Sequence, residues 1–383
     1  MKTKKLYDID AYKTEFDARV LSCEKGEDDR YCVVLDQTLF FPEEGGQTPD
    51  KGTLDEIEVL DVQIKGDVVF HYTEEAFEVD SIVRGTIDWS HRFSNMQQHS
   101  AEHIFSGLAY KKYGYANVGF HLSNQIVTMD FSGVFTEEEL REMEWEVNEA
   151  IAKNVEIKTG YPSKEELANL EYRSKIEIEG DIRIVEVVGY DMCACCAPHV
   201  KHTGEIGGFK IQSAQKYKGG MRISFLAGFR ALEEYRVKAA IISELSDILS
   251  TNQMNLPEYV NKLKSQIYDL KGQLSTAKQT LLESKIAEIP VEQKDVILFE
   301  KDLDAPVMRT VINKLMDNHE GICGIFVGDD ANGYQYILGS KVVNCSEVST
   351  KLREELGARG GGKPQMVQGS VEATEEHIKR VLL

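Results

Sequence analysis

The sequence lacks any run of about 18 apolar residues, so no segment has the composition of a membrane-spanning helix. Residues 1–16, MKTKKLYDIDAYKTEF, also lack the apolar stretch of a secretory signal, and we therefore expect a cytoplasmic protein. At 383 residues the chain is too long for one ordinary core. With 42% hydrophobic and 28% charged residues, it can fold into two or three domains.

The cysteines do not form the even set that a disulfide framework requires. There are seven, and three of them lie in the string CACC at residues 193–196. In a chain without an export signal, this crowding indicates metal or thiol chemistry.

Positive charge is scarce, because 64 acidic residues outweigh 44 basic ones and leave a net charge of −20. This balance argues against a nucleic-acid partner. The excess is local, however, since residues 1–200 contain 40 acidic and 20 basic residues while the remainder is neutral. Residues 201–240 carry eight basic residues and three Glu, and they fit either a solvated hairpin surface or a phosphate-contacting patch. The candidate phosphate contacts are Lys216, Lys218 and Arg222.

Hydrophobic patterning predicts an α+β protein with four domains. Residues 1–88 are rich in strand and turn patterns and predict a β-rich, barrel-like domain. Residues 89–229 mix helical spacing with strands, and Gly219-Gly220 between two strand-like runs predicts a tight hairpin. Residues 230–290 are helical, and residues 291–383 alternate strands and helices as in a compact α/β domain.

The helical segment carries an apolar seam with the spacing of a coiled coil. Its members are Leu256, Val260, Leu263, Ile267, Leu270, Leu274, Ala277 and Leu281. A seam of about four heptads favours a helical hairpin or a dimer coil over a helix packed only on its own domain.

Two pairs of residues have the spacing of metal ligands. His99 and His103 lie one turn apart on a predicted helix, so their imidazoles share a face. Cys195 and His199 repeat this separation downstream, and together the four form a Cys/His3 set suited to Zn²⁺. Cys193 or Cys196 are alternative sulfur ligands. Four protein ligands are typical of a structural site, whereas a catalytic site keeps a position open.

Residues 99–103, HSAEH, also match H-x-x-E-H, the inverted zinc-peptidase signature. Glu102 is therefore a candidate catalytic base for a metal-activated water molecule. A solvent-facing helical Glu is the alternative. The downstream ligands here are Cys and His rather than the Glu of such peptidases, which weighs against peptidase activity.

The motifs as a set resemble a known family. HSAEH followed by CCAPHVKHTGEIG resembles the editing domain of alanyl-tRNA synthetase and of its free-standing relatives, the AlaX proteins. FFPEEGGQTPDKG, MDFSG, GGMRISFLAGFRALEE and the C-terminal GGGKPQMVQGS resemble further blocks of the long AlaX form, in the same order. The last block resembles the DHHA1 domain that the synthetase shares with DHH-type phosphoesterases. Two differences are Cys-Ala-Pro between the last two ligands, in place of the usual CGGTH pattern, and Glu102 where Thr is common.

The resemblance implies a Zn²⁺-dependent deacylase that hydrolyses Ser-tRNA(Ala) or Gly-tRNA(Ala) in trans, without aminoacylation activity. In the family, His99, His103, Cys195 and His199 correspond to the zinc ligands. Gly45 and Gly46 would allow close approach of the terminal adenosine. Candidates for reading the serine hydroxyl are Gln47, Asn117 and His121.

The resemblance also implies partners. Arg359 and Lys363, beside the glycines of the C-terminal motif, are candidates for gripping tRNA. The helical segment and the C-terminal domain are expected to form a homodimer. Two alternative functions are a zinc metallopeptidase and a non-catalytic, zinc-stabilised tRNA-binding module.

Overall fold

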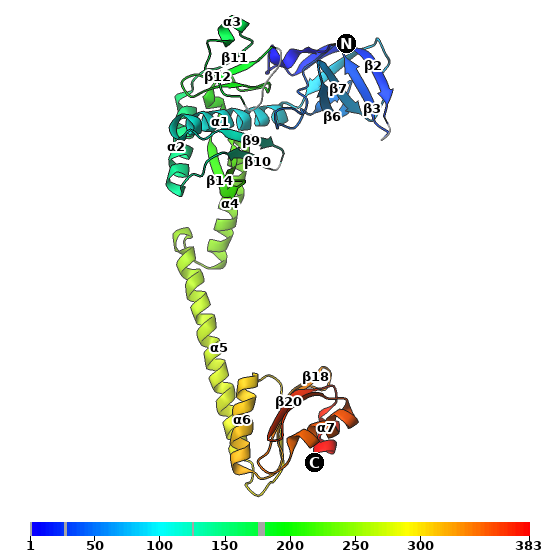
Figure 1. Cartoon of the computed structure of the whole chain (residues 1–383), viewed down its shortest axis with the longest axis vertical. Helices are drawn as coiled ribbons and strands as arrows, with labels where there is room; N and C mark the ends of the chain where they lie inside the picture. The colour runs from blue at the N-terminus through cyan, green and yellow to red at the C-terminus, as the bar shows by residue number, and fades with distance from the viewer. Residues whose placement is uncertain (1, 27–28, 125, 175–180) are drawn as a thin grey trace. The chain divides into compact units, whose positions relative to one another are not determined.

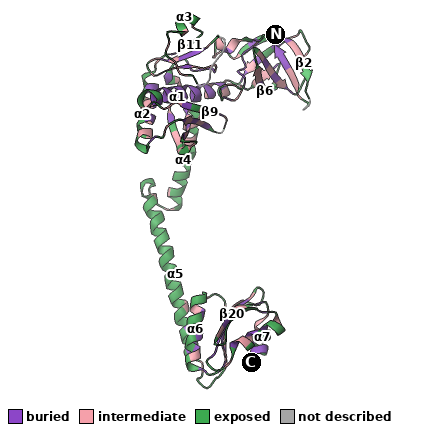
Figure 2. Ribbon diagram, viewed as in Figure 1, coloured by how far each residue is buried: buried purple, intermediate pink, exposed green. Residues whose placement is uncertain are grey.

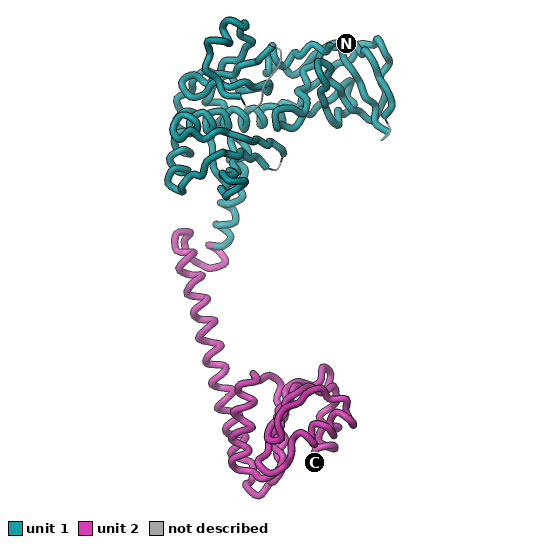
Figure 3. Tube along the Cα trace, in the orientation of Figure 1, with its two compact units in different colours: residues 1–245 teal, residues 246–383 magenta. Residues whose placement is uncertain are grey.

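The computed structural model describes residues 2–26, 29–124, 126–174 and 181–383. These form two compact units, residues 1–245 and 246–383, and each has its own hydrophobic cores (Figure 3). Both units mix helices and strands (Figure 1), which confirms the predicted α+β class. The finer division into four domains stays a prediction.

Six strands of the first unit close into a barrel. In their order around it they are β2 (Glu15–Lys25), β3 (Tyr31–Leu35), β7 (Val68–Thr73), β6 (Ile57–Lys65), β5 (Gly52–Leu54) and β8 (Ile82–Ile87). Side chains alternate between core and surface in the first half of β2, where Phe16, Ala18 and Val20 are buried and Glu15, Asp17 and Arg19 are exposed. Two shorter strands, β1 (Lys4–Lys5) and β4 (Gln37–Thr38), pair in parallel, and a 3-10 turn, η1 (Leu6–Asp8), follows β1.

Helix α1 (Trp89–Tyr113) is largely buried, as Figure 2 shows. Asp88 caps its first turn by accepting a hydrogen bond from the His91 N–H, and Gly114 ends it in the left-handed conformation. Near its start, the side chain of Arg92 is fully buried and forms an ion pair with buried Asp50. The same guanidinium donates to the carbonyl oxygens of Ala11 and Leu39. Arg92 thereby ties α1 to the segments that flank the barrel strands.

The middle of the first unit packs α1 and α2 (Glu137–Lys153) against a four-stranded antiparallel sheet. Its strands, in sheet order, are β14 (Phe209–Tyr217), β15 (Gly220–Ala227), β10 (Val127–Phe131) and β9 (Asn117–Leu122). Thr136 and Glu139 form a capping box at the start of α2. A 3-10 turn, η2 (Thr203–Ile206), precedes β14.

The tight hairpin predicted at Gly219-Gly220 forms between β14 and β15, but its turn lies one residue earlier. Lys218 and Gly219 are the turn residues with positive φ, 47° and 85°. Gly220 already pairs with Tyr217 in the sheet. The predicted turn position is therefore wrong by one residue, because Lys218 adopts the left-handed conformation that the prediction reserved for glycine.

A second sheet of three antiparallel strands lies next to α1. It consists of β11 (Ile157–Gly160), β12 (Ile184–Val187) and β13 (Asp191–Ala194), and a short helix, α3 (Lys164–Leu167), follows β11. Gly107 on α1 permits the close approach of β13. A Cβ atom at Gly107 would lie 2.4 Å from the carbonyl oxygen of Tyr190 and 2.7 Å from Cβ of Asp191. Because Gly107 has no side chain, β13 can pack this closely against α1.

Two long helices occupy the segment that the sequence predicts as helical. They are α4 (Gly228–Ile248) and α5 (Leu256–Ala287), and a 3-10 turn, η3 (Gln253–Asn255), precedes α5. The apolar seam of α5 is exposed (Figure 2), with Ile267 54%, Leu270 62% and Leu274 56% accessible. Self-association through this seam stays a prediction. None of the described helices combines the length with the apolar composition needed to cross a lipid bilayer.

The second unit contains a five-stranded sheet in which only β16 and β17 run parallel. In sheet order its strands are β16 (Val296–Glu300), β17 (Cys323–Asp329), β18 (Gly333–Gly339), β20 (Met366–Val371) and β19 (Arg359–Lys363). The helices of this unit after α5 are α6 (Ala305–Asn318), α7 (Cys345–Leu356) and α8 (Glu375–Leu382).

The buried ion pair of Arg92 leads to a prediction about stability. An Arg92→Ala substitution is expected to lower the free energy of unfolding of the first unit by about 3–5 kcal/mol, because it leaves Asp50 charged and buried without its partner. Urea unfolding followed by tryptophan fluorescence measures this, since Trp89 and Trp145 both lie in this unit.

The control is Arg84→Ala, which removes an exposed ion pair with Glu15 and should lower the free energy of unfolding far less, because water screens exposed charges. Equal losses in the two variants would contradict a structural role for the buried pair.

Candidate metal centre

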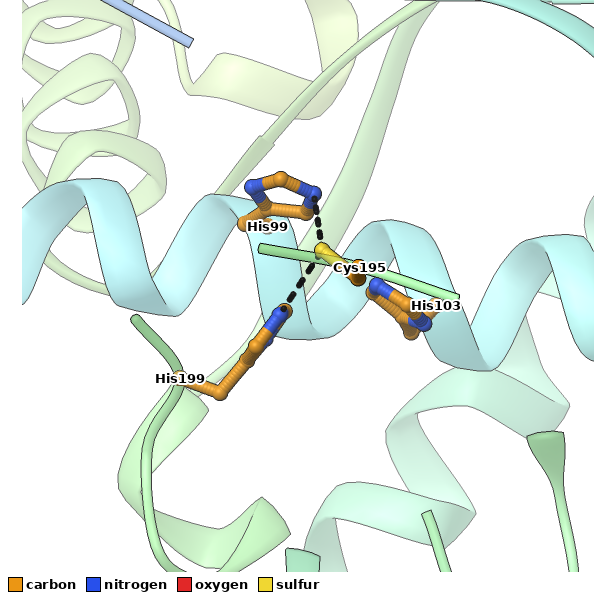
Figure 4. Close-up of side chains that lie close together, drawn as sticks. All are labelled: His99, His103, Cys195 and His199. Carbon is orange, nitrogen blue, oxygen red and sulfur yellow. Dashed lines mark hydrogen bonds between the residues drawn. The ribbon is translucent and has the colours of Figure 1, made fainter. Parts of the chain in front are cut away.

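Four side chains predicted as metal ligands come together in the first unit (Figure 4). His99 and His103 project from α1, Cys195 follows directly after β13, and His199 lies four residues further on. Their ligand atoms all lie within 4.8 Å of one another. Cys195 Sγ is 3.6 Å from His99 Nε2 and 3.4 Å from His199 Nε2.

These separations fit a tetrahedral zinc site. With Zn–S bonds of about 2.3 Å and Zn–N bonds of about 2.0–2.1 Å, tetrahedral angles place sulfur and nitrogen about 3.5–3.6 Å apart. One thiolate and three imidazoles are also ligands that zinc accepts. The donor set and its spacing therefore both suit Zn²⁺.

Each of the three imidazoles is oriented by a hydrogen bond at Nδ1, on the side of the ring away from the cluster. The partners are Gln47 Oε1 for His99 at 2.9 Å, Asp191 Oδ2 for His103 at 2.8 Å, and Ser100 Oγ for His199 at 3.0 Å. A proton held at Nδ1 leaves Nε2 as the lone-pair atom, which is the arrangement common in metal centres.

Asp191 is itself held by Arg173 through two parallel hydrogen bonds of 2.7 and 2.8 Å. Burial would raise the pKa of Asp191, but the hydrogen bonds from His103 and Arg173 lower it below its usual value. The carboxylate thus stays ionised, and it fixes the His103 ring against a partner that is anchored in turn.

The electrostatics of the cluster favour a thiolate. Burial would raise the pKa of the Cys195 thiol, but the three surrounding histidines bring it well below its usual value. Burial also lowers the pKa of His199 to about 3, so its imidazole is neutral. Burial opposes charge on His103 as well, yet the hydrogen bonds to Asp191 and Cys195 raise its pKa to about 10. A metal ion binding here would displace that proton.

The structure distinguishes the three neighbouring cysteines. Among the described residues, Cys195 is the one whose sulfur groups with all three histidines. Cys193 groups instead with His103 and Asp191, and burial raises its pKa to about 12. Burial, Cys195 and Glu44 raise the pKa of Cys196. Both are therefore protonated thiols at neutral pH, and Cys195 is the best-placed sulfur ligand.

The cluster borders a cavity of about 530 Å³, whose lining includes His99, His103 and Cys195. Glu102 also lines it and is only 1% exposed, so the solvent-facing alternative for this residue is wrong. Its Oε1 accepts hydrogen bonds from Ser106 Oγ and Asn117 Nδ2.

The glycine-rich loop reaches the same cavity through Gly45. Gly46, with φ of 84°, leaves no room for a side chain, because a Cβ atom there would lie 2.1 Å from the carbonyl oxygen of Phe120. The loop is held on β9 by hydrogen bonds from the Leu122 N–H to the Gly46 oxygen and from the Thr48 N–H to the Leu122 oxygen. This contact places Gln47 beside His99.

Other predicted site residues lie away from the cluster. His121 is exposed on β9 and is not part of the group formed by the four ligands. Lys216 and Lys218 are exposed on the β14–β15 hairpin. Arg222 pairs with Asp130 through two hydrogen bonds of 2.7 Å, so its guanidinium is already occupied. Arg359 and Lys363 are exposed on β19 of the second unit.

Sequence patterns did not identify Ser100, Arg173 or Asp191 as supports of the centre. Asp191 lies four residues before Cys195, the same separation as between Cys195 and His199, but carboxylates at such spacings are too common to be a signal. Gln47 was predicted to contact substrate, and the structure adds a hydrogen bond to His99.

The chain is similar to several known proteins. The model of the threonyl and alanyl tRNA synthetase second additional domain matches residues 182–224, which include Cys195 and His199. The model of class II (A) tRNA synthetases matches residues 7–91. The alanyl-tRNA editing protein AlaX-L of Pyrococcus horikoshii is 28% identical over 99% of this chain and 97% of its own length.

The chain is thus similar over nearly its whole length to the alanyl-tRNA editing proteins AlaX-L and Aarsd1. Aarsd1 of Danio rerio is 28% identical over 95% of this chain and 93% of its own length. Alanine–tRNA ligase of Methanoregula boonei is 33% identical over 96% of this chain. The chain spans about two fifths of the length of the ligases that it matches, 41% in this case.

The outer hydrogen bonds of the centre lead to a second prediction. An Asp191→Asn variant is expected to bind zinc about 10-fold to 100-fold more weakly, because a neutral amide holds the His103 imidazole less strongly. Competition against a chromophoric zinc chelator, together with metal analysis, measures the affinity.

Asp130→Asn is the matched control, because Asp130 is also paired with an arginine by two hydrogen bonds but lies outside the cluster. Unchanged affinity in Asp191→Asn would remove its supporting role. Full zinc content in both His99→Ala and Cys195→Ala would remove the centre itself.

Proposed function

We propose that this protein hydrolyses the aminoacyl ester of tRNA(Ala) wrongly charged with serine or glycine. It acts in trans, in the cytoplasm, and does not itself charge tRNA. The observation that carries the proposal is the Cys/His3 cluster opening onto a cavity, within a chain that matches the editing protein AlaX-L over nearly its full length.

His99, His103, Cys195 and His199 would hold the zinc ion. When bound, zinc supplies Lewis-acid chemistry, which polarises an ester carbonyl and makes a water molecule more acidic. Glu102 is the candidate proton acceptor for the attacking water, because it lines the same cavity. Ser106 and Asn117 donate to its Oε1 and so fix the carboxylate in position.

Gln47 is the candidate reader of the serine hydroxyl that we favour, because its amide nitrogen is an unsatisfied donor within the described part of the chain. The amide of Asn117 already donates to Glu102 and Ser106, and His121 is exposed. The Nε2 of Gln47 is buried and has no hydrogen-bond partner among the described residues. A serine hydroxyl would satisfy this donor, whereas alanine would leave it unpaired, and such a difference is the physical basis for sparing Ala-tRNA(Ala).

The exposed cations are proposed to contact the tRNA body. Lys216 and Lys218 are exposed on the first unit, and Arg359 and Lys363 are exposed on the second. Contacts of this kind bind phosphates without reading sequence, and their strength falls with salt. Arg222 is paired with Asp130, so we expect it to contribute less to tRNA binding than the two lysines of the hairpin.

The direct test is deacylation. With Ser-tRNA(Ala) and Ala-tRNA(Ala) as substrates, the protein is expected to hydrolyse the seryl ester at least about 100-fold more efficiently. Cys195→Ala is expected to lose zinc and about 100-fold or more of kcat/KM. Loss of radiolabelled amino acid from precipitable tRNA measures both.

Persistence of both esters, or their equal loss, would overturn the proposal. Tight, salt-sensitive tRNA binding without turnover would support the non-catalytic module. A Glu102→Gln variant with full deacylase activity would remove the base role of Glu102, and peptide cleavage that depends on Glu102 would support the peptidase.

We also propose a homodimer formed through the α5 seam and the C-terminal unit. The exposure of Leu270 and Leu274 supports this, since apolar seams of this length are rarely left in water. A Leu270→Asp/Leu274→Asp variant is expected to sediment as a monomer in analytical ultracentrifugation. Lys271→Asp, between them, is the control, and an unchanged mass for the double variant would exclude the seam as the interface.

A further inference from the structure

The cavity beside the Cys/His3 cluster is lined by one basic and one acidic side chain whose hydrogen-bonding or ion-pairing capacity is not fully used within the described part of the protein. Its lining includes Lys5 from β1 and Glu44 from the loop after β4, both far in sequence from the four ligands. Arg183 also lines the cavity, but its guanidinium forms an ion pair with Asp8 at 3.5 Å and donates hydrogen bonds to the carbonyl oxygens of Cys195 and Ala197.

Lys5 is half-buried, while its neighbour Lys4 on the same short strand is exposed. Among the described residues, no carboxylate oxygen lies within 4.0 Å of the Lys5 ammonium nitrogen. Lys2, three residues earlier, does have such a partner, because its ammonium nitrogen lies 3.3 Å from a carboxylate oxygen of Asp67. A cation that is partly withdrawn from water, without an ion pair, is suited to an anionic ligand.

Glu44 shows the complementary feature. Its Oε2 is buried and has no hydrogen-bond partner among the described residues. The backbone of Glu44 is fixed by paired hydrogen bonds with Gln47, of 3.1 and 3.3 Å, so the loop holds the side chain at the cavity. A buried carboxylate oxygen without a donor is costly unless a ligand supplies one.

These two charges match the end of an aminoacylated tRNA. The amino acid bears an α-ammonium group, and a phosphate lies on the 5′ side of the terminal adenosine. A cavity of about 530 Å³ is far larger than a seryl group and is within the usual size for a nucleoside-sized ligand. We propose that Lys5 binds this phosphate and that Glu44 binds the α-ammonium group, an inference that rests on the proposed function.

Two consequences follow from this assignment. The enzyme requires a free α-amino group, so it rejects N-acylated aminoacyl esters and peptidyl-tRNA. It also distinguishes an ester on a nucleotide from the same ester on a nucleoside. Both properties concern the shared end of every aminoacyl-tRNA and are independent of how serine is told apart from alanine.

The experiment uses three small esters and the intact protein. They are 3′-O-seryl-adenosine 5′-phosphate, the same ester without the phosphate, and its N-acetylseryl form with the phosphate. For the unaltered protein, removal of the phosphate is expected to raise KM about 10-fold with little change in kcat, because one charge-assisted contact is lost. N-acetylation is expected to lower kcat/KM by about 10-fold or more.

The variants separate the two contacts. In Lys5→Ala, the KM values for the seryl esters with and without the phosphate should be equal, and discrimination against the N-acetyl ester should remain. Lys5→Arg should restore the phosphate dependence. Glu44→Gln should lose discrimination against the N-acetyl ester but keep the phosphate dependence. The exposed neighbours Lys4 and Glu43 provide matched controls, Lys4→Ala and Glu43→Gln, which should behave like the unaltered protein.

Zinc content and thermal unfolding are measured for every variant, so that loss of fold is not mistaken for loss of a contact. Phosphate dependence that persists in Lys5→Ala overturns the first assignment, and discrimination that persists in Glu44→Gln overturns the second. If the unaltered protein leaves Ser-tRNA(Ala) intact, the proposed function fails. If it cleaves Ser-tRNA(Ala) but ignores both the phosphate and the acetyl group, only this inference fails.

Discussion

The architecture of the first unit depends on one constraint: three imidazoles and a thiolate must present their lone pairs to one point inside the protein. Gathering these groups in a buried place is unfavourable unless each ring is held by a second partner and the negative charge is balanced. The hydrogen bonds at the Nδ1 atoms of His99, His103 and His199 meet the first requirement. A proton on His103, or a metal ion in its place, meets the second.

Helix α1 is the element that makes this convergence achievable. Its first turns carry Arg92, which anchors the helix to the segments around the barrel strands through Asp50. Its middle carries two ligands and Glu102, and Gly107 lets β13 approach closely enough for Asp191 to reach His103. One helix thus connects the glycine-rich loop, the Cys/His3 cluster and the second sheet, and a shift of the helix along its axis would disturb all three.

Acidic and basic residues are distributed unevenly in this protein, so the net charge says little about whether it binds a nucleic acid. The net charge of −20 includes carboxylates that serve inside the fold, such as Asp50, Asp191 and Glu102, each held by donors from the protein. The charges that we propose to contact a ligand are few and specific. They are the partly buried Lys5 and Glu44 at the cavity and exposed cations on the hairpin and on β19.

Sequence alone determined the α+β class, the long helices and the four candidate ligands, because helical periodicity and the i, i+4 spacing are local properties that survive without tertiary knowledge. It left the sulfur ligand open among three cysteines, and it placed the hairpin turn one residue late. Tertiary structure decided that Cys195 faces all three histidines, that Glu102 is buried, that Asp191 and Ser100 support the ligands, and that His121 is exposed. These facts depend on contacts between residues tens of positions apart, for which local spacing carries no signal.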